Sequence, residues 1–385
     1  MKILITTDLF TVTTNGVVTS VKNLWDELKS HGHDVRILTL SDNIHSHRDG
    51  DVYYIRSMPF AVYPNVRMPL SYRHHLIKEL IEWAPDVIHS QCEFFSFQYA
   101  LRISRKTGAP IVHTYHTLYE QYVGYVFPSR RLGCKIVRVF SRKRLKRVKN
   151  VIAPTHKVED TLHTYGLKNS ISVVPSGISL AQHFARLTPD ERLEKRRALG
   201  IHDDTVLLVN IGRVGAEKNL GELVTFFSKA VAKGYNIMFM IVGDGPARKD
   251  LENQACELGI DEKMIFTGMV KPGEVQNYYQ LGDVFVSAST SETQGLTYIE
   301  AAANALPLLC RKDMCLDEVL YNGENGYDYT NEDEFMRGLD AVVNDPEWRK
   351  TAGKKSEDIA RAFDKSSFGV AVEQLYESIV KANKG

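Results

Sequence analysis

The sequence has few cysteines and no long apolar run. Its five cysteines include no Cys-x-x-Cys pair, so a disulfide framework is not expected and free thiols in a reducing compartment are. No apolar run approaches the roughly 18–20 residues that a membrane-spanning helix needs. The chain begins directly with a strand-like segment, Met1 to Ile5, which is not the pattern of a signal peptide. We therefore expect a cytoplasmic protein that crosses no membrane.

Length and charge indicate two domains. A chain of 385 residues is too long for one ordinary core, and its content of 43% hydrophobic and 25% charged residues is that of a soluble globular protein. The net charge of +1 hides an asymmetry, because residues 1–180 carry 24 Lys+Arg against 14 Asp+Glu, whereas residues 181–385 carry 24 against 33. A basic N-terminal half suits an anionic membrane, nucleic acid or an acidic substrate.

Short apolar runs alternate with longer amphipathic segments along the whole chain. This alternation predicts an α/β protein with parallel sheets covered on both faces, in two Rossmann-like domains. We place the boundary near Ser176 to Phe184, which gives an N-terminal domain of residues 1–180 plus a helix at 366–385, and a C-terminal domain of residues 181–365. Candidate strands begin near Lys2, Asp34, Val52, Asp86, Ile111, Asn150, Ser172, Thr205, Asn236, Lys263, Asp283, Leu306 and Gly326.

The segment Ser291–Glu300 is the most informative part of the chain. It follows the apolar run Asp283–Ser287, and Gly295 stands where a helix would begin. The start of a helix presents free backbone N–H groups to an anion, and a carboxylate on each side of it, Glu292 and Glu300, can hold hydroxyls. The pattern fits a nucleotide-sugar site, although the same spacing of two Glu also occurs on ordinary exposed helices.

Two further loops follow apolar runs. Gly212–Asn219 carries Arg213, whose planar fork suits a diphosphate, and Lys218, which supplies a point charge. The turn Ile241–Pro246 contains Gly243 but lacks the third glycine of a dinucleotide fingerprint. Because all these loops come at the carboxyl ends of predicted strands, where ligands bind to such sheets, we expect one shared binding site.

In this order the three motifs resemble the C-terminal half of a family 4 glycosyltransferase. Thr14–Val17 and His113–Thr117 are similar to the glycine-rich turn and the active-site histidine segment of the N-terminal half. The resemblance implies the GT-B fold, in which two Rossmann-like domains face each other across a cleft and the last helix crosses back to the N-terminal domain. The turn Ser176–Ser179 departs from the family pattern, which usually has Asn first and Asp last.

The resemblance also implies roles for individual residues. His116 would bind a hydroxyl of the donor sugar, Glu292 would lie at that sugar, and Glu300 would hold the ribose. Arg213, Lys218 and the helix start would stabilise the leaving diphosphate in a retaining, front-face transfer without a metal ion. No cofactor is expected beside the donor substrate, for which UDP-glucose is the leading candidate. The donor would also contact Gly16, Gly243, Val270, Thr293, Gly295 and Leu296.

The segment Arg130–Lys149 contains ten Lys or Arg and no acidic residue. At helical spacing it predicts a basic stripe beside an apolar one, which suits a helix lying on an anionic bilayer. A helix packed on the core with a solvated basic face is the alternative; RNA binding is less favoured because only Phe140 interleaves with the charges. The basic stripe is Arg131, Lys135, Arg138, Arg142, Lys146 and Lys149, and the apolar stripe is Leu132, Ile136, Val137 and Phe140.

The segment Tyr115–Tyr122 resembles the subgroup that glucosylates diacylglycerol. We therefore expect a peripheral enzyme on the inner face of the cell membrane, with a lipid acceptor such as diacylglycerol or glucosyl diacylglycerol and no nucleic-acid partner. Two alternatives stay open. One is a soluble family 4 transferase acting on a small sugar, a polyol or a glycerol-phosphate polymer, and the other is a non-catalytic protein that binds a nucleotide sugar or RNA.

Overall fold

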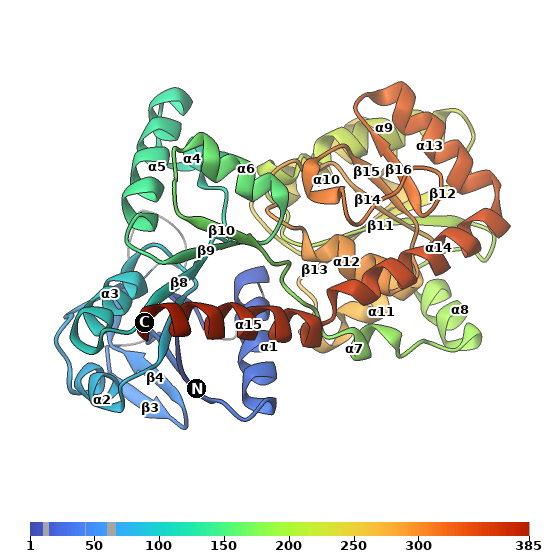
Figure 1. Cartoon of the computed structure of the whole chain (residues 1–385). Coiled ribbons are helices and arrows are strands. Elements are labelled where there is room, and N and C mark those ends of the chain that lie inside the picture. The colour runs from blue at the N-terminus through green and yellow to red at the C-terminus, as the bar shows by residue number, and fades with distance from the viewer. Residues whose placement is uncertain (11–14, 43, 60–66, 385) are drawn as a thin grey trace. The chain divides into compact units, whose positions relative to one another are not determined.

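The chain folds into two compact units, and a computed structural model describes residues 1–10, 15–42, 44–59 and 67–384. Unit 1 is formed by Met1–Gly177 together with Lys365–Gly385, and unit 2 by Ile178–Asp364 (Figure 1). The chain thus leaves unit 1 after Gly177 and returns to it at Lys365. Thr14, from the predicted glycine-rich turn, lies outside the described residues.

Unit 1 is built on a sheet of strand order β10-β9-β8-β7-β1-β2-β4-β3, in which all neighbours are parallel except β3 and β4. Its central strands are almost entirely buried, as expected for a parallel sheet with helices on both faces. The chain runs from β1 to β2 on one side and later to β7 on the other, so the strand order reverses beside β1. The strands are β1 (Lys2–Thr6), β2 (Asp34–Leu40), β3 (His47–Asp49), β4 (Val52–Ile55), β7 (Val87–Ser90), β8 (Ile111–Thr114), β9 (Asn150–Ala153) and β10 (Ser170–Val173).

The helices of unit 1 lie in the sequence between these strands, except α15, which follows unit 2. A separate antiparallel pair, β5 (Ser57–Pro59) with β6 (Arg67–Pro69), and the short strand β3 were not foreseen from the sequence. The helices are α1 (Gly16–Ser30), α2 (His75–Trp83), α3 (Phe95–Thr107), η1 (Tyr119–Gln121), α4 (Val123–Val126), α5 (Arg130–Leu145), α6 (His156–Thr164) and α15 (Lys365–Lys384).

The last helix, α15, belongs to unit 1 and lies alongside α1 (Figure 1). Val372 and Tyr376 are fully buried in the same core cluster as Leu24. The Tyr376 hydroxyl lies 2.5 Å from Nδ1 of the buried His89. The prediction that the final helix returns to the N-terminal domain is confirmed, and buried apolar contacts fix it there.

Unit 2 is built on a fully parallel sheet of order β13-β12-β11-β14-β15-β16. The chain leaves β11 for β12 and β13 on one side and returns to β14 on the other, so the order reverses between β11 and β14. The strands are β11 (Val206–Ile211), β12 (Ile237–Val242), β13 (Met264–Gly268), β14 (Val284–Ser287), β15 (Leu308–Arg311) and β16 (Gly326–Tyr329). In open α/β sheets, ligands bind beside such a reversal, beyond the carboxyl ends of the strands.

Helices connect these strands, and two core clusters fill the unit. Apolar runs spaced by amphipathic helices produce this architecture, because each strand must be covered on both faces. The α/β prediction with two Rossmann-like sheets is confirmed. The helices are α7 (Leu180–Phe184), α8 (Pro189–Ala198), η2 (Ala216–Lys218), α9 (Leu220–Ala232), α10 (Arg248–Glu257), η3 (Asp261–Lys263), η4 (Pro272–Glu274), α11 (Val275–Leu281), α12 (Leu296–Ala303), η5 (Met314–Leu316), α13 (Glu332–Asn344), α14 (Pro346–Ala360) and η6 (Arg361–Phe363).

Candidate functional site

The loops after β11 and β14 meet where the strand order of unit 2 reverses. Lys218, in η2 after β11, forms an ion pair with Glu292, in the loop after β14, although the two residues are 74 positions apart. The Ser289 hydroxyl donates a hydrogen bond of 3.0 Å to Oε1 of Glu292. Two residues that the sequence pointed to separately are therefore brought into direct contact at the place where the fold favours a ligand.

Arg213 lies in the loop that also carries Lys218, and its guanidinium pairs with Glu217. The Glu217 side chain is only 4% exposed, whereas that of Arg213 is 44% exposed. A guanidinium carries five N–H donors in a planar fork, and the ion pair with Glu217 uses only some of them. Glu217 thus orients the Arg213 guanidinium at the surface of the loop, and the remaining N–H groups can bind a phosphate.

Backbone hydrogen bonds tie the first residues after β11 and β12 to the ends of the neighbouring strands. The Gly212 N–H donates to the Val242 carbonyl at 2.9 Å, and the Gly243 N–H donates to the Gly268 carbonyl at 3.0 Å. Gly243 has φ 129°, and a Cβ there would lie 1.9 Å from the Gly212 carbonyl oxygen. Only glycine permits this approach, so Gly243 shapes the base of the Arg213 loop.

The start of α12 has the geometry that the sequence pattern suggested. Gly295 is the N-cap residue in the left-handed conformation, and α12 begins at Leu296. A Cβ on Gly295 would lie 2.3 Å from the Tyr298 ring, so this position also requires glycine. The backbone N–H groups in the first turn of a helix have no partner within the helix, and the loop of Glu292 and Thr293 leads directly into them.

Glu300 lies one helical turn further along α12. Its carboxylate accepts a hydrogen bond of 2.8 Å from the Tyr279 hydroxyl of α11. Burial raises the pKa of Glu300 to about 7, and the Tyr279 hydrogen bond opposes part of that rise. A carboxyl with this pKa is costly to keep charged, which is a frequent property of functional sites.

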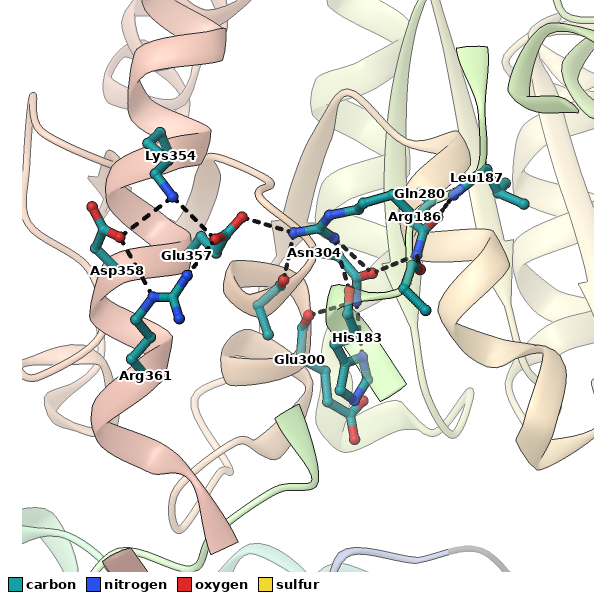
Figure 2. Close-up of polar contacts among 12 residues, drawn as sticks. His183, Arg186, Leu187, Gln280, Glu300, Asn304, Lys354, Glu357, Asp358 and Arg361 are labelled. Atoms are coloured by element: carbon teal, nitrogen blue, oxygen red, sulfur yellow. Dashed lines mark hydrogen bonds and ion pairs between the residues drawn. The ribbon is translucent and has the colours of Figure 1, made fainter. Parts of the chain in front are cut away.

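A polar network fixes the far end of α12 within unit 2. Figure 2 shows Asn304 between Arg186 and Gln280, and the Glu300 carboxylate extending away from these contacts. Arg186 Nη2 donates to the Ala303 carbonyl at 2.8 Å, so a guanidinium satisfies an acceptor at the helix end. Because α12 is held in this way, Glu300 has a defined position.

Val270, the residue expected beside the base, follows β13 and is partly buried against the core of unit 2. Leu296 packs against the same cluster through its side chain. Neither observation tests a contact with a nucleotide, and the roles of both residues stay predictions.

The corresponding edge of unit 1 carries His116. Its Nε2 donates a hydrogen bond of 2.6 Å to Oε1 of Gln91, which follows β7. Burial, and then the charge of His113, lower the pKa of His116 to about 3, so its imidazole is neutral at physiological pH. His116 lies in the loop beyond β8, which ends at Thr114, and this loop sets the direction of the ring.

His113 and His116 have different partners. His113 Nε2 lies 3.0 Å from Oε1 of the buried Glu93, whereas His116 bonds to Gln91. No group of three or more His, Cys, Asp or Glu side chains is placed to hold a metal ion within the described ranges. The expectation of a reaction without a metal ion stays a prediction.

Gly16 is the first residue of α1, in the segment that follows β1. The side chain of Asn15 caps this helix by accepting the Val18 N–H at 2.9 Å. The sequence did not identify Gln91, Glu93, Glu217 or Tyr279 as partners of the predicted site residues. Gln91 and Glu93 directly follow the apolar run of β7, so the strand-end signal that selected the other loops also applies to them.

Helix α5 exposes both basic and apolar side chains. Gly133, Ser141 and Leu145 are buried against unit 1, whereas Leu132, Ile136 and Val139 are exposed by 55%, 43% and 49%. The predicted apolar stripe is therefore partly wrong, because Val137 and Phe140 are partly buried and Val139 takes their place at the surface. An apolar strip of Leu132, Ile136 and Val139 remains uncovered by unit 1.

The predicted basic stripe also needs correction. Helix α5 ends at Leu145, and Lys149 lies beyond it, where its N–H donates to the Ile111 carbonyl beside the sheet. Arg138 is held by Glu120 at 2.6 Å. Arg131, Lys135, Arg142 and Lys146 are exposed. No helix in the described part of the chain is long and apolar enough to cross a bilayer.

Two family models together match most of the chain. Residues 14–182 match the model described as Glycosyltransferase Family 4, and residues 191–359 match Glycosyl transferases group 1. An alpha-monoglucosyldiacylglycerol synthase of Streptococcus pneumoniae is 32% identical, over 100% of this chain and 87% of the relative. A protein of the same name from Acholeplasma laidlawii is 29% identical, over 100% and 98%.

Solved structures show the same fold. A sucrose-phosphate synthase from Thermosynechococcus elongatus superimposes with a TM-score of 0.78 at 20% identity, covering 99% of both chains. Anabaena HepE, solved in complex with UDP-glucose, superimposes with a TM-score of 0.77 at 16% identity, over 98% of this chain and 100% of that one. These likenesses confirm the predicted GT-B fold.

Proposed function

The chain belongs to the family 4 glycosyltransferases, and from that premise we propose that it moves glucose from UDP-glucose to diacylglycerol or a glucosyl diacylglycerol, with retention, at an anionic membrane. The relatives from S. pneumoniae and A. laidlawii, both named alpha-monoglucosyldiacylglycerol synthase, support the lipid acceptor. The structure of HepE with UDP-glucose supports the donor, since that chain has the same fold.

The observation that carries the proposal is the contact between Lys218 and Glu292 beside the start of α12. A diphosphate placed at this helix start would meet backbone N–H groups, the Lys218 ammonium and the Arg213 guanidinium. As the bond from the sugar C1 to the diphosphate breaks, these donors would stabilise the charge that develops on the leaving oxygen. Glu292 would then be oriented by Lys218 and Ser289 to bind hydroxyls of the sugar.

In the proposed reaction, the acceptor hydroxyl attacks C1 on the face from which UDP departs, and its proton passes to the leaving phosphate. Glu300 would hold the ribose hydroxyls, because its half-buried carboxylate, which accepts one bond from Tyr279, has further lone pairs that can accept such bonds. His116, neutral and oriented by Gln91, would bind a sugar hydroxyl without adding a positive charge.

We also propose that α5 holds the enzyme at the membrane surface. The exposed strip of Leu132, Ile136 and Val139, flanked by exposed cations, has the pattern of a helix that lies in a membrane interface. Anionic head groups attract each nearby Lys or Arg by about 1 kcal/mol. Among the predicted basic residues, Lys135, Arg142 and Lys146 are the best placed for this role, because Glu120 already holds Arg138.

The proposal is tested by supplying UDP-glucose to the purified protein with diacylglycerol in vesicles that contain an anionic phospholipid, and analysing the products by mass spectrometry. A glucosyl lipid is the expected product. Release of glucose with no glucosyl lipid would remove the lipid acceptor and favour a soluble acceptor such as a small sugar, a polyol or a glycerol-phosphate polymer. Absence of turnover with any nucleotide sugar would favour a non-catalytic binding protein.

Single substitutions test the assignment of residues to the donor site. Lys218→Ala and Glu292→Ala should each lower transfer by about 10²–10³-fold, the usual effect of losing one preorganised charge contact, while thermal unfolding stays cooperative. Lys229→Ala is the matched control, because Lys229 forms an ion pair with Glu332 on other elements of the same unit. Activity near wild type in either site variant would contradict the assignment.

The membrane role has its own test. Reversing the charges of Lys135, Arg142 and Lys146 should weaken sedimentation with anionic vesicles and leave hydrolysis of UDP-glucose in solution unchanged. Equal binding of the variant and the wild type would remove α5 from the proposal.

A further inference from the structure

Unit 1 contains a hollow of about 280 Å³ that is lined by Phe140, Lys143, Arg144 and Arg147. These positions are spaced by three, one and three residues, so they form one face at the C-terminal end of α5 and just beyond it. The lining contains three cations and one aromatic ring, and no acid. At this size the hollow suits a head group, since sites for whole small molecules usually occupy about 300–1,000 Å³.

Arg144 lies against aromatic side chains in the hollow. Its guanidinium lies 5.2 Å from the Phe140 ring centroid and 6.0 Å from that of Phe97, which is fully buried. The Phe140 ring in turn stacks on Phe94, with centroids 5.5 Å apart. A guanidinium packed against aromatic rings has fewer conformations open to it than one in solvent, so less entropy is lost on binding.

Arg147 repels Arg144 within the hollow. Among the residues that the structure describes, Lys143, Arg144 and Arg147 form no ion pair, unlike Arg138, which bonds to Glu120 at 2.6 Å. Burial, and then the charge of Arg147, lower the pKa of Arg144. An anion bound in the hollow would relieve this repulsion.

The hollow is continuous along α5 with apolar surface. Leu132, Ile136 and Val139 are exposed on this helix, and Lys143 lies one turn beyond Val139 on the same side of it. A ligand that fits both parts has a negatively charged head and apolar chains. The charge complementarity and the adjoining strip together select a lipid over a free anion.

We propose that this hollow is a discrete site for the phosphodiester head group of an anionic phospholipid, whose acyl chains lie along the strip of Leu132, Ile136 and Val139. The lipid is a membrane anchor with one-to-one stoichiometry and is distinct from the acceptor. The inference deepens the proposed membrane role of α5, because it replaces diffuse attraction to a charged surface by recognition of a single molecule.

The test uses dihexanoyl phosphatidylglycerol, kept below its critical micelle concentration, titrated into the full-length protein by calorimetry. Saturable one-to-one binding is expected, with dihexanoyl phosphatidylcholine at least about tenfold weaker, since its added quaternary ammonium is repelled by the three cations. Binding of inorganic phosphate as tight as that of the short-chain lipid would overturn the lipid assignment, and so would equal binding of phosphatidylcholine.

A matched pair of variants locates the site. Lys143→Gln with Arg147→Gln removes two exposed cations from the hollow, and Arg131→Gln with Lys135→Gln removes two exposed cations from elsewhere on α5. The first variant should weaken binding of the short-chain lipid at least tenfold. The second variant, whose Lys135 contributes to the diffuse attraction, should weaken it by clearly less, and Arg105→Gln with Lys106→Gln on α3, two exposed cations of the same unit, should change it less than about twofold. Equal weakening by the first two variants would show only diffuse attraction and would refute a discrete site.

The outcome is independent of the glucosyl transfer reaction. Transfer to diacylglycerol is assayed in neutral detergent micelles, which contain no anionic lipid, so it reports on the proposed function alone. Transfer without saturable binding of phosphatidylglycerol would refute the lipid site in the hollow and leave the proposed transferase activity standing. Saturable binding of phosphatidylglycerol without transfer would support the lipid site in the hollow and reject the proposed reaction.

Discussion

Replacing Glu300 by Gln should stabilise the protein and weaken its binding of the donor. The pKa of Glu300 rises from 4.5 to about 7 because the side chain is buried. One pKa unit corresponds to about 1.4 kcal/mol, so charging this carboxylate in the folded protein costs about 3 kcal/mol at most. Since the side chain keeps some contact with solvent, we expect about 1–3 kcal/mol.

The direction in which stability changes with pH follows from which state, folded or unfolded, binds the proton of Glu300 more tightly. Folded Glu300 binds a proton more tightly than the unfolded chain does, so between pH 4.5 and about 7 the free energy of unfolding falls as the pH rises. Above that window the full cost applies, and below it both states are protonated and the cost disappears. Glutamine is never charged, so the Glu300→Gln variant lacks this penalty at any pH.

The assay is urea unfolding of wild type and Glu300→Gln at pH 5 and pH 8. The variant should gain about 1–3 kcal/mol at pH 8 and much less at pH 5. Glu257→Gln, an exposed position on α10, is the control and should change stability little at either pH. An equal gain at both pH values, or a loss at pH 8, would refute the argument from burial.

The same variant should bind UDP more weakly. Glutamine can still accept the hydrogen bond from Tyr279, but it has lost the charge that strengthens bonds to ribose hydroxyls, an effect of about 1.5–3 kcal/mol. We expect UDP affinity by calorimetry at pH 8 to fall about 10–100-fold. Higher stability together with lower affinity is the pattern of a residue kept for function, and unchanged affinity would remove Glu300 from the donor site.

Three other variants test separate parts of the structure. Asp283→Ala should cost about 3–5 kcal/mol in urea unfolding, because it removes the carboxylate 2.9 Å from Arg196, whose side chain is buried and would keep an uncompensated charge. Gly243→Ala would place a Cβ 1.9 Å from a neighbouring carbonyl oxygen, so it should weaken UDP binding at least tenfold in calorimetry. Gln91→Glu should raise the pKa of His116 from about 3, because it places a negative charge against the imidazole. In a pH–rate profile, transfer by this variant should therefore fall as the pH drops below neutral, whereas transfer by the wild type should not.

Local patterns were enough to predict the fold class and the loops of the site. Apolar runs separated by amphipathic stretches gave both parallel sheets, since covered strands must be apolar on both faces. The start of α12 after Gly295 was also predictable, because a left-handed glycine next to a helix depends on neighbouring residues only. The short strands β3, β5 and β6 were missed, because three residues carry too little periodicity to be recognised.

The sequence by itself determined most of the segments that form strands, helices and strand-end loops, and through its motifs it pointed to Lys218, Glu292 and Glu300. Only the tertiary structure decided which of these side chains meet. The ion pair of Lys218 with Glu292 and the bond from Tyr279 to Glu300 depend on strand order and helix packing, which no local spacing encodes. Likewise, which face of α5 the core covers depends on what packs against it, and so the exposed strip and the cationic hollow could not be predicted from periodicity alone.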